Sequence, residues 1–158
     1  MAVEARRAAR NERAQRGRGG IEPKGDVYRI MQVAYPAAFL VMIGEGLLRG
    51  GAPSSTPLAL GLALFAASKA LKWWAIRSLG VAWTFRVIVV PGVALVATGP
   101  YRLLRHPNYV AVTGELVSVA LMSEARIAGP LATALFVLLM VRRIAIENAA
   151  LDAILRRH

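Results

Sequence analysis

The stretch IMQVAYPAAFLVMIGEGLL, residues 30–48, decides the class of fold. It holds nineteen residues and one charged side chain, Glu45, which lies near its end. At ~1.5 Å per residue, a helix of this length reaches across the ~30 Å hydrocarbon core of a bilayer. We therefore expect residues 30–48 to form a transmembrane helix.

Three further apolar stretches follow it. Residues 49–57 are rich in Gly, Ser and Pro, and Pro57 suits the first turn of a helix over residues 57–76. Pro107 likewise begins a helix over residues 107–122, and a last one is expected over residues 127–148. The predicted fold class is all-α, an integral-membrane bundle of about four transmembrane helices. The membrane domain is expected to comprise residues 30–158, with its last span ending at residue 148.

One apolar segment is too short to span the membrane, and two lysines lie near the end of a predicted span. Val87 to Ala97 is apolar but only eleven residues long and is interrupted by Pro91-Gly92, so we expect a partly extended connector at the membrane surface rather than a span. Lys69 and Lys72 fall in the last turns of the second helix. Their long side chains are expected to snorkel toward the interface beside Trp73 and Trp74.

Residues 1–29 contain eight basic residues and few large apolar ones. Such a segment has too little apolar surface to form a core, so we expect a basic, flexible tail. A tail beside a membrane would attract anionic lipids, and binding to nucleic acid is the less favoured alternative. The segment is too long and too interrupted to match the start of a secretory signal.

The whole chain is both very basic and very apolar. Its 158 residues carry a net charge of +11, yet 56% are hydrophobic and the mean hydropathy is +0.48. This combination argues against a disordered basic protein and against a soluble nucleic-acid-binding domain. With four spans and the N-terminus inside, 18 of the 20 basic residues fall on one side, as the positive-inside rule requires. We therefore expect a multi-pass protein with both termini cytoplasmic, and no nucleic-acid partner.

The chain contains no cysteine, which excludes disulfides, thiolate metal sites and a cysteine nucleophile. No metal site is predicted. The residues best suited to a site lie together in GPYRLLRHPNY, residues 99–109, which combines two arginines, two tyrosines and one of the two histidines. His106 alone would be read as an interfacial histidine with satisfied ring nitrogens, but its neighbours favour a functional site.

This segment resembles the Gly-Pro-Tyr-Arg-x-x-Arg-His-Pro-x-Tyr motif of the isoprenylcysteine carboxyl methyltransferase family and of related phospholipid methyltransferases. Residues 79–101 upstream also resemble family members, as do NYVAVTGEL (residues 108–116) and RRIAIENAAL (residues 142–151) downstream. The resemblance covers about residues 57–151 and is strongest to bacterial members, which suggests a bacterial inner membrane.

The resemblance implies a membrane-embedded methyltransferase domain that uses S-adenosylmethionine and releases S-adenosylhomocysteine. Carried over by position, one wall of the cofactor pocket would comprise Gly99, Pro100, Tyr101, His106, Pro107 and Tyr109, and the other would comprise Arg143, Glu147 and Asn148. Relatives usually have a second glutamate where this chain has Asn148, which puts cofactor affinity in doubt. Without the resemblance, the spacing of Arg143 and Glu147 would indicate only an i,i+4 ion pair on a helix.

The expected catalytic residues are Arg102, Arg105 and His106. Either arginine can hold an acceptor anion, and His106 can position the cofactor or the acceptor. Glu115 lies inside a predicted span, where a charge is costly, so we expect it to bond a neighbouring helix or the cofactor, or to line the path of the acceptor.

The partners predicted are membrane lipids and a lipophilic acceptor. That acceptor is the carboxylate of a prenylated-cysteine-like compound or the hydroxyl of a lipid, with a phospholipid amine as the alternative. A carboxylate is already ionised near neutral pH, so its methylation needs no general base. A protein of another class remains open: a non-catalytic lipid-binding membrane protein that retains the fold, favoured by Asn148 and the short C-terminal segment.

Overall fold

The computed structural model describes residues 2–155, which form five α-helices and two short 3₁₀ turns. The elements in chain order are α1 (Ala2–Gly17), α2 (Tyr28–Arg49), α3 (Ser55–Leu79), η1 (Gly80–Ala82), η2 (Gly99–Arg102), α4 (Pro107–Met122) and α5 (Ala128–Leu155). Within this range the only β-type pairing is one isolated bridge between Ile21 and Val89. The predicted all-α fold class is confirmed. Arg156 and Arg157, which the predicted charge asymmetry includes, lie outside the described residues.

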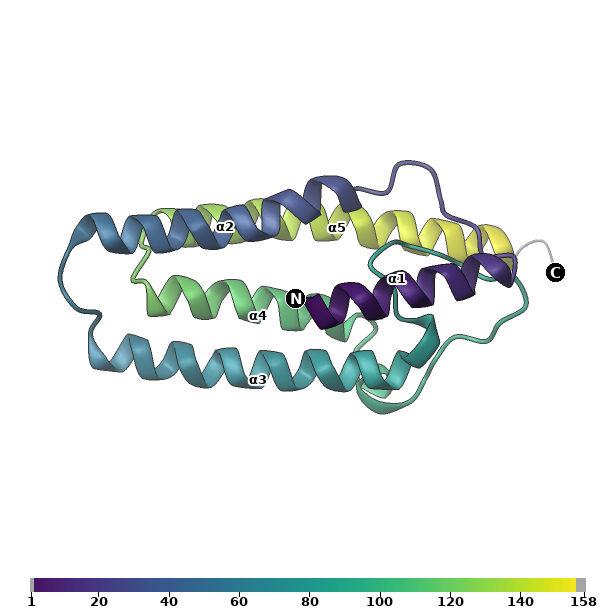
Figure 1. Ribbon diagram of the computed structural model, residues 1–158, viewed down its shortest axis with the longest axis horizontal. Coiled ribbons are helices and arrows are strands. Elements are labelled where there is room, and N and C mark those ends of the chain that lie inside the picture. Colours follow the sequence, from purple (N-terminus) through teal and green to yellow (C-terminus); the bar gives the residue numbers. More distant parts are fainter. Residues whose placement is uncertain (1, 156–158) are drawn as a thin grey trace.

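Helices α2 to α5 run alternately up and down and form a four-helix bundle (Figure 1). Helix α4 lies in the middle of the bundle and packs against α2, α3 and α5. Helix α1 lies against one half of the bundle, toward the end at which α4 begins and the chain ends. We call this the motif end, because it carries residues 99–109.

Three of the described helices are long and apolar enough to cross a membrane: α2, α3 with its extension to Ala82, and α5 as far as Ala153. The chain is therefore an integral membrane protein with a helical bundle. Helix α4 is shorter, at 16 residues. The last helix extends beyond the predicted residues 127–148, so that its charged C-terminal part continues past the apolar run as one uninterrupted helix.

Small residues set the close approach of α3 to α4. A Cβ atom placed on Gly61 of α3 would lie 2.8 Å from the carbonyl oxygen of Ser118, and one on Gly114 of α4 would lie 2.2 Å from Oγ of Ser68. Helices in a bilayer associate through such close packing, because lipid removes the hydrophobic drive that operates in water. The two glycines thus fix how deeply α4 is seated against α3.

Carboxylates cap the opposite end of the bundle. Glu45 accepts hydrogen bonds from the backbone N–H groups of Ile127 and Ala128, the latter at 2.6 Å, at the start of α5. Glu124 accepts one from the N–H of Ser54, also at 2.6 Å, and this bond lowers the pKa of the Glu124 carboxyl. A carboxylate at a helix start satisfies free amides and the helix dipole. The single charge in the first apolar run therefore has a structural task.

The expectation of a flexible tail over residues 1–29 is not what the structure shows. Residues 2–17 form α1, and one face of this helix is buried; it consists of Glu4, Ala8, Asn11 and Gln15. Three of these four side chains are polar, so the face carries little hydrophobic signal. It packs because its polar groups find partners at the motif end: the side-chain amide of Asn11 donates to the carbonyl oxygens of Gly80 and Trp83 at 3.0 and 2.7 Å.

The packing of α3 on α4 predicts that Gly61→Ala is destabilising, because the added methyl meets backbone atoms that have no freedom to move aside. Overpacking of this kind costs about 1–3 kcal/mol. Gly44→Ala is the matched control, since a Cβ on Gly44 of α2 meets nothing within 4 Å. Thermal unfolding in detergent should show a lower midpoint for Gly61→Ala alone. Equal midpoints for the two variants would contradict the close α3–α4 contact.

Candidate functional site

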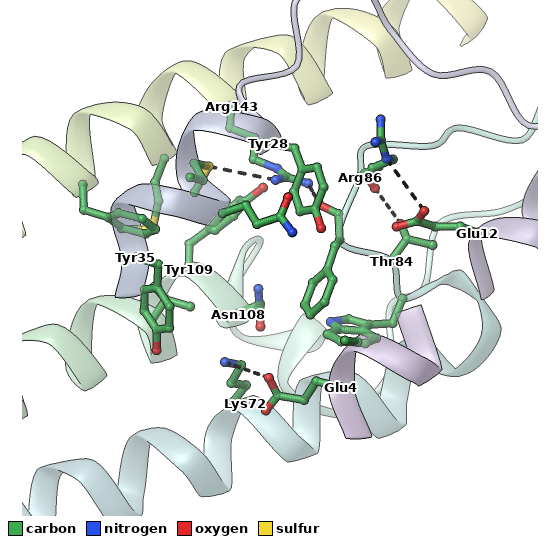
Figure 2. Close-up of a pocket in the computed structure, with 18 of the residues that line it drawn as sticks. Glu4, Glu12, Tyr28, Tyr35, Lys72, Thr84, Arg86, Asn108, Tyr109 and Arg143 are labelled. Carbon is green, nitrogen blue, oxygen red and sulfur yellow. Dashed lines mark hydrogen bonds and ion pairs between the residues drawn. The ribbon is translucent and has the colours of Figure 1, made fainter. Parts of the chain in front are cut away.

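Two cavities lie side by side at the motif end. The first, the motif cavity, has a volume of about 440 Å³ and lies between the loop of residues 81–96, the motif segment and the C-terminal half of α5. The second, the central cavity, has a volume of about 550 Å³ and lies among α1, α2, α4 and α5 (Figure 2). Both have the size of pockets that bind small molecules.

The motif cavity gathers most of the predicted site residues. Those that line it are Tyr101, Arg105, His106, Tyr109, Arg143, Glu147 and Asn148. The two walls implied by the resemblance, one from residues 99–109 and one from the last helix, therefore face the same space. Its third wall is apolar and comes from the connector, which the sequence reading placed at the membrane surface.

Five of the predicted residues lie off this cavity, and one of them, Glu115, is described below. Gly99, Pro100 and Pro107 shape the backbone: Gly99 has a φ of 59°, and a Cβ there would lie 2.0 Å from Oγ of Ser78. Its lack of a side chain lets η2 pack directly on α3. Pro100 and Pro107 are fully buried, the latter in the first turn of α4. Arg102 is exposed and lines neither cavity, whereas Arg105 lines the motif cavity.

Several polar groups in the motif cavity are buried without a hydrogen-bond partner among the described residues. They include Nε2 of His106 and Oδ1 of Asn148. A buried polar atom without a partner is costly, and a bound ligand is one way to satisfy it. The hydroxyl of Tyr109 donates to Glu147 at 3.2 Å. Burial, and then the charge of Glu147, raises the pKa of the Tyr101 hydroxyl, which keeps this side chain neutral.

Arg143 does not form the i,i+4 pair with Glu147 that the residues alone suggested, as judged from the ion pairs within residues 2–155. Its guanidinium instead donates to the carbonyl oxygen of Phe85 and lies 3.9 Å from Asp26. The residue is only 7% exposed, and its Nε has no hydrogen-bond partner in the described part of the chain. A buried guanidinium with a free donor is suited to receive an anion.

The two cavities share part of their lining. Asn108, Tyr109 and Arg143 line both, as do Trp83, Thr84 and Arg86, which directly precede the connector. Oδ1 of Asn108 is another buried polar atom without a partner in residues 2–155. Figure 2 places the Asn108 side chain between Lys72 on one side and Tyr28 with Arg143 on the other. Ligands in the two cavities would therefore meet at these residues.

The central cavity combines an apolar wall with a group of charges. Met31, Val112, Phe136 and Met140 supply apolar surface. Beside them, Lys72 lies 3.5 Å from Glu4 and 3.5 Å from Glu115. The expectation that Lys72 snorkels to the interface is therefore wrong. Its side chain points into the bundle because two carboxylates compensate its charge there (Figure 2).

Glu115 bonds neighbouring helices, one of the roles expected for it. Its side chain is fully buried, lies 3.0 Å from Nζ of Lys69 and accepts a hydrogen bond from the hydroxyl of Tyr35. Glu115 lines neither cavity itself, although its partners Lys72 and Tyr35 both line the central one.

The residues that hold the connector were not predicted from the sequence. The carboxylate of Glu22 pairs with Arg86 at 2.6 Å, and the carboxylate of Asp26 accepts a hydrogen bond from the N–H of Val87 at 3.2 Å. Burial opposes ionisation of Glu22, but its bonds to Arg86 and Arg16 prevail and lower its pKa. Backbone bonds between Ile21 and Val89 add an extended pair. One signal was available: Glu4, Ala8, Asn11 and Gln15 recur at helical spacing, but only Ala8 among them is apolar.

These contacts predict that Asn11→Ala loosens the connector, because the carbonyl oxygens of Gly80 and Trp83 lose their donor. A buried acceptor left without a partner costs about 1–3 kcal/mol. Hydrogen exchange of amides in residues 80–90 should therefore become faster. Arg10→Ala, an exposed change on the same helix, serves as the control and should leave exchange unaltered. Equal protection in both variants would contradict the role of α1 in ordering this wall.

Comparison with known proteins places these features in a family. Residues 59–153 match the isoprenylcysteine carboxyl methyltransferase (ICMT) family. The uncharacterized protein YpbQ of Bacillus subtilis is 34% identical over 145 residues, which are 92% of this chain and 86% of the relative. An uncharacterized protein of Haemophilus influenzae is 24% identical over 144 residues, which are 90% and 83% of the two chains. No solved structure shows significant similarity.

The matched range contains the whole motif segment and α4, and nearly all of α3 and α5, so it includes both predicted walls of the motif cavity. Only the N-terminal segment that carries α1 and α2 precedes it. The chain belongs to the isoprenylcysteine carboxyl methyltransferase family of integral membrane proteins.

Proposed function

We propose that this chain is a membrane methyltransferase that uses S-adenosylmethionine and methylates a lipophilic acceptor carrying a carboxylate or an acidic hydroxyl. The observation that carries the proposal is the pair of cavities that share Asn108, Tyr109 and Arg143. A two-substrate transfer needs two binding spaces that meet at the reacting atoms. The motif cavity suits the donor and the central cavity suits the acceptor.

The residues of the motif cavity fit the donor. Glu147 is an acceptor for the cofactor's ammonium group or ribose hydroxyls, and Asn148 offers an unpaired carbonyl oxygen for the same groups. Arg105 supplies a positive charge for the carboxylate of the cofactor. The apolar connector wall, residues 87–96, suits the flat purine ring. The replacement of a second glutamate by Asn148 removes a charge from this wall but keeps an acceptor of hydrogen bonds.

The central cavity fits an amphiphilic acceptor. Its apolar side chains suit a hydrocarbon chain, and Arg143 lies where this cavity meets the motif cavity. Of the acceptors considered from sequence, an acidic one is favoured over an amine because the buried Arg143 has an unused donor. The carboxylates in the same cavity, Glu4 and Glu12, already have Lys72 and Arg86 as partners.

The chemistry asks little of the protein beyond positioning. S-adenosylmethionine supplies a methyl group on a positively charged sulfur. Arg143 and Asn108 would orient the acceptor oxygen at the junction, and the buried wall around Tyr109 would exclude water. A carboxylate, with an ordinary pKa of ~4, is already ionised and needs no base. For a hydroxyl acceptor, His106 is the candidate base from the sequence, and its Nε2 has no partner among the described residues. Because His106 lines the motif cavity and not the central one, such an acceptor would have to extend its hydroxyl past the shared residues.

The same arrangement bears on where the site lies in the cell. We propose that the motif end faces the cytoplasm of a bacterial cell, where a water-soluble donor is available. The acceptor would then reach the central cavity from the lipid. The exposed basic side chains at this end, Arg77, Arg102 and Arg105 among them, fit an inner leaflet with anionic lipids.

Binding of the donor is the first test. Calorimetry with purified protein should show that S-adenosylmethionine binds, and that Glu147→Ala weakens it by about 10- to 100-fold, the effect of losing a charged hydrogen bond. His106→Ala should also weaken binding, and Arg105→Ala should weaken it more than Arg102→Ala. Asp152→Asn, an exposed change on α5, is the control. Absence of binding would favour a non-catalytic lipid-binding protein instead.

Transfer itself is the second test. Membranes containing the protein are supplied with the methyl-labelled donor and total lipid extract, or with a farnesyl-cysteine analogue. We expect labelled lipid product that Arg143→Met lowers by at least about tenfold, the effect of ~1.4 kcal/mol lost in the transition state. Mild base releases methanol from an ester but not from an ether or an amine. A methylamine product would overturn the assignment of an acidic acceptor.

A further inference from the structure

Helix α1 precedes the residues that match the family, so its role has to be inferred from its own contacts. Its buried face fixes it over the central cavity. Glu4 pairs with Lys72 at 3.5 Å, Asn11 holds Gly80 and Trp83, and Gln15 donates to the carbonyl oxygen of Val81 at 2.8 Å. These bonds join α1 to α3 and to the connector. They leave a second face of the helix, with Ala5 and Ala9, turned toward the cavity.

That second face forms part of the cavity's opening. Ala5 and Ala9 line the central cavity and are nevertheless exposed. On the other side, Gln32 and Pro36 of α2 also line the cavity and are exposed. Residues that do both lie where a cavity reaches the surface. The entrance therefore lies between α1 and α2, with two alanines on one lip.

The entrance lies near the first turns of α2, a helix long and apolar enough to cross a membrane. Gln32 and Pro36 follow the first residue of α2 by four and eight positions, which places them roughly 6 and 12 Å along this spanning helix. Arg6, Arg10 and Arg13 are exposed on α1, away from its buried face. Such side chains attract anionic lipid headgroups. An amphiphile in the bilayer thus has its polar head close to this opening.

The interior indicates what passes through. Arg143 is more than nine-tenths buried and lines the cavity. Its Nε and the Oδ1 of Asn108 both have no hydrogen-bond partner among residues 2–155. The apolar wall lies beside them. An occupant with an acidic head and a hydrocarbon part would complement both, and the volume of about 550 Å³ favours a small amphiphile over a double-chained lipid.

We propose that α1 is a specificity element: Ala5 and Ala9 form one lip of the entrance through which a single-chained or flat acidic amphiphile leaves the bilayer and enters the central cavity. The identity of this amphiphile as a methyl acceptor rests on the function proposed above. The position of the entrance does not.

Entry is tested first without any reaction. Because the chain has no cysteine, Val112→Cys places a single thiol inside the central cavity. In membranes, a lipid-soluble maleimide should label this thiol, and adding Ala9→Trp should slow labelling by about tenfold, a barrier of ~1.4 kcal/mol. Ala14→Trp is the matched control, since Ala14 is exposed on α1 but lines neither cavity. Equal labelling rates in the two tryptophan variants would overturn the proposal.

The second arm tests specificity. Ala9→Trp and Ala5→Trp should raise KM for the acceptor with little change in kcat, and should leave the affinity for S-adenosylmethionine unaltered, which also shows that the variants fold. An unchanged KM would contradict the role of α1. If no variant transfers methyl while Ala9→Trp still slows labelling, the proposed function fails and the entrance stands.

Discussion

A fully buried carboxylate constrains the whole bundle. Glu115 of α4 has no exposed surface and is compensated by Lys69 and Lys72 of α3 and by the hydroxyl of Tyr35 of α2. Removing one partner of a buried ion pair costs about 3–5 kcal/mol, so these helices have little freedom to shift. Lys72 extends the network to Glu4 of α1. The same group of charges that joins the helices thus fixes one side of the central cavity and the helix at its entrance.

Rigidity here is useful because the proposed chemistry depends on placement. Methyl transfer between two bound molecules gains most from holding the reacting atoms in line in a dry site. The residues shared by the two cavities come from separate elements: Asn108 and Tyr109 from the start of α4, Arg143 from α5 and Trp83 from the loop between η1 and the connector. Close packing at Gly61 and Gly99 and the bonds from α1 hold these elements in register. Structure far from the junction therefore determines its geometry.

The sequence predicted the bundle and most of the motif cavity, because both rest on strong signals. Long apolar runs identify membrane helices, and residues 99–109 match a family motif. The sequence did not predict that residues 2–29 have a defined structure packed against the bundle. The buried face of α1 is largely polar, and Asn11 is satisfied by carbonyl groups about seventy positions away, which local patterns do not reveal. Lys72 was misplaced for a similar reason, since its partners lie on other helices. The sequence does not distinguish Arg102 from Arg105. In the structure Arg102, the last residue of η2, lies off the motif cavity, whereas Arg105 lines it.

We propose that donor and acceptor occupy neighbouring cavities that meet at Asn108, Tyr109 and Arg143. An experimental structure with S-adenosylhomocysteine tests it most directly. We expect the ligand in the motif cavity, in contact with His106 and Glu147, with its sulfur directed toward the shared residues. A ligand bound in the central cavity, or with its sulfur directed away from Arg143, would contradict it.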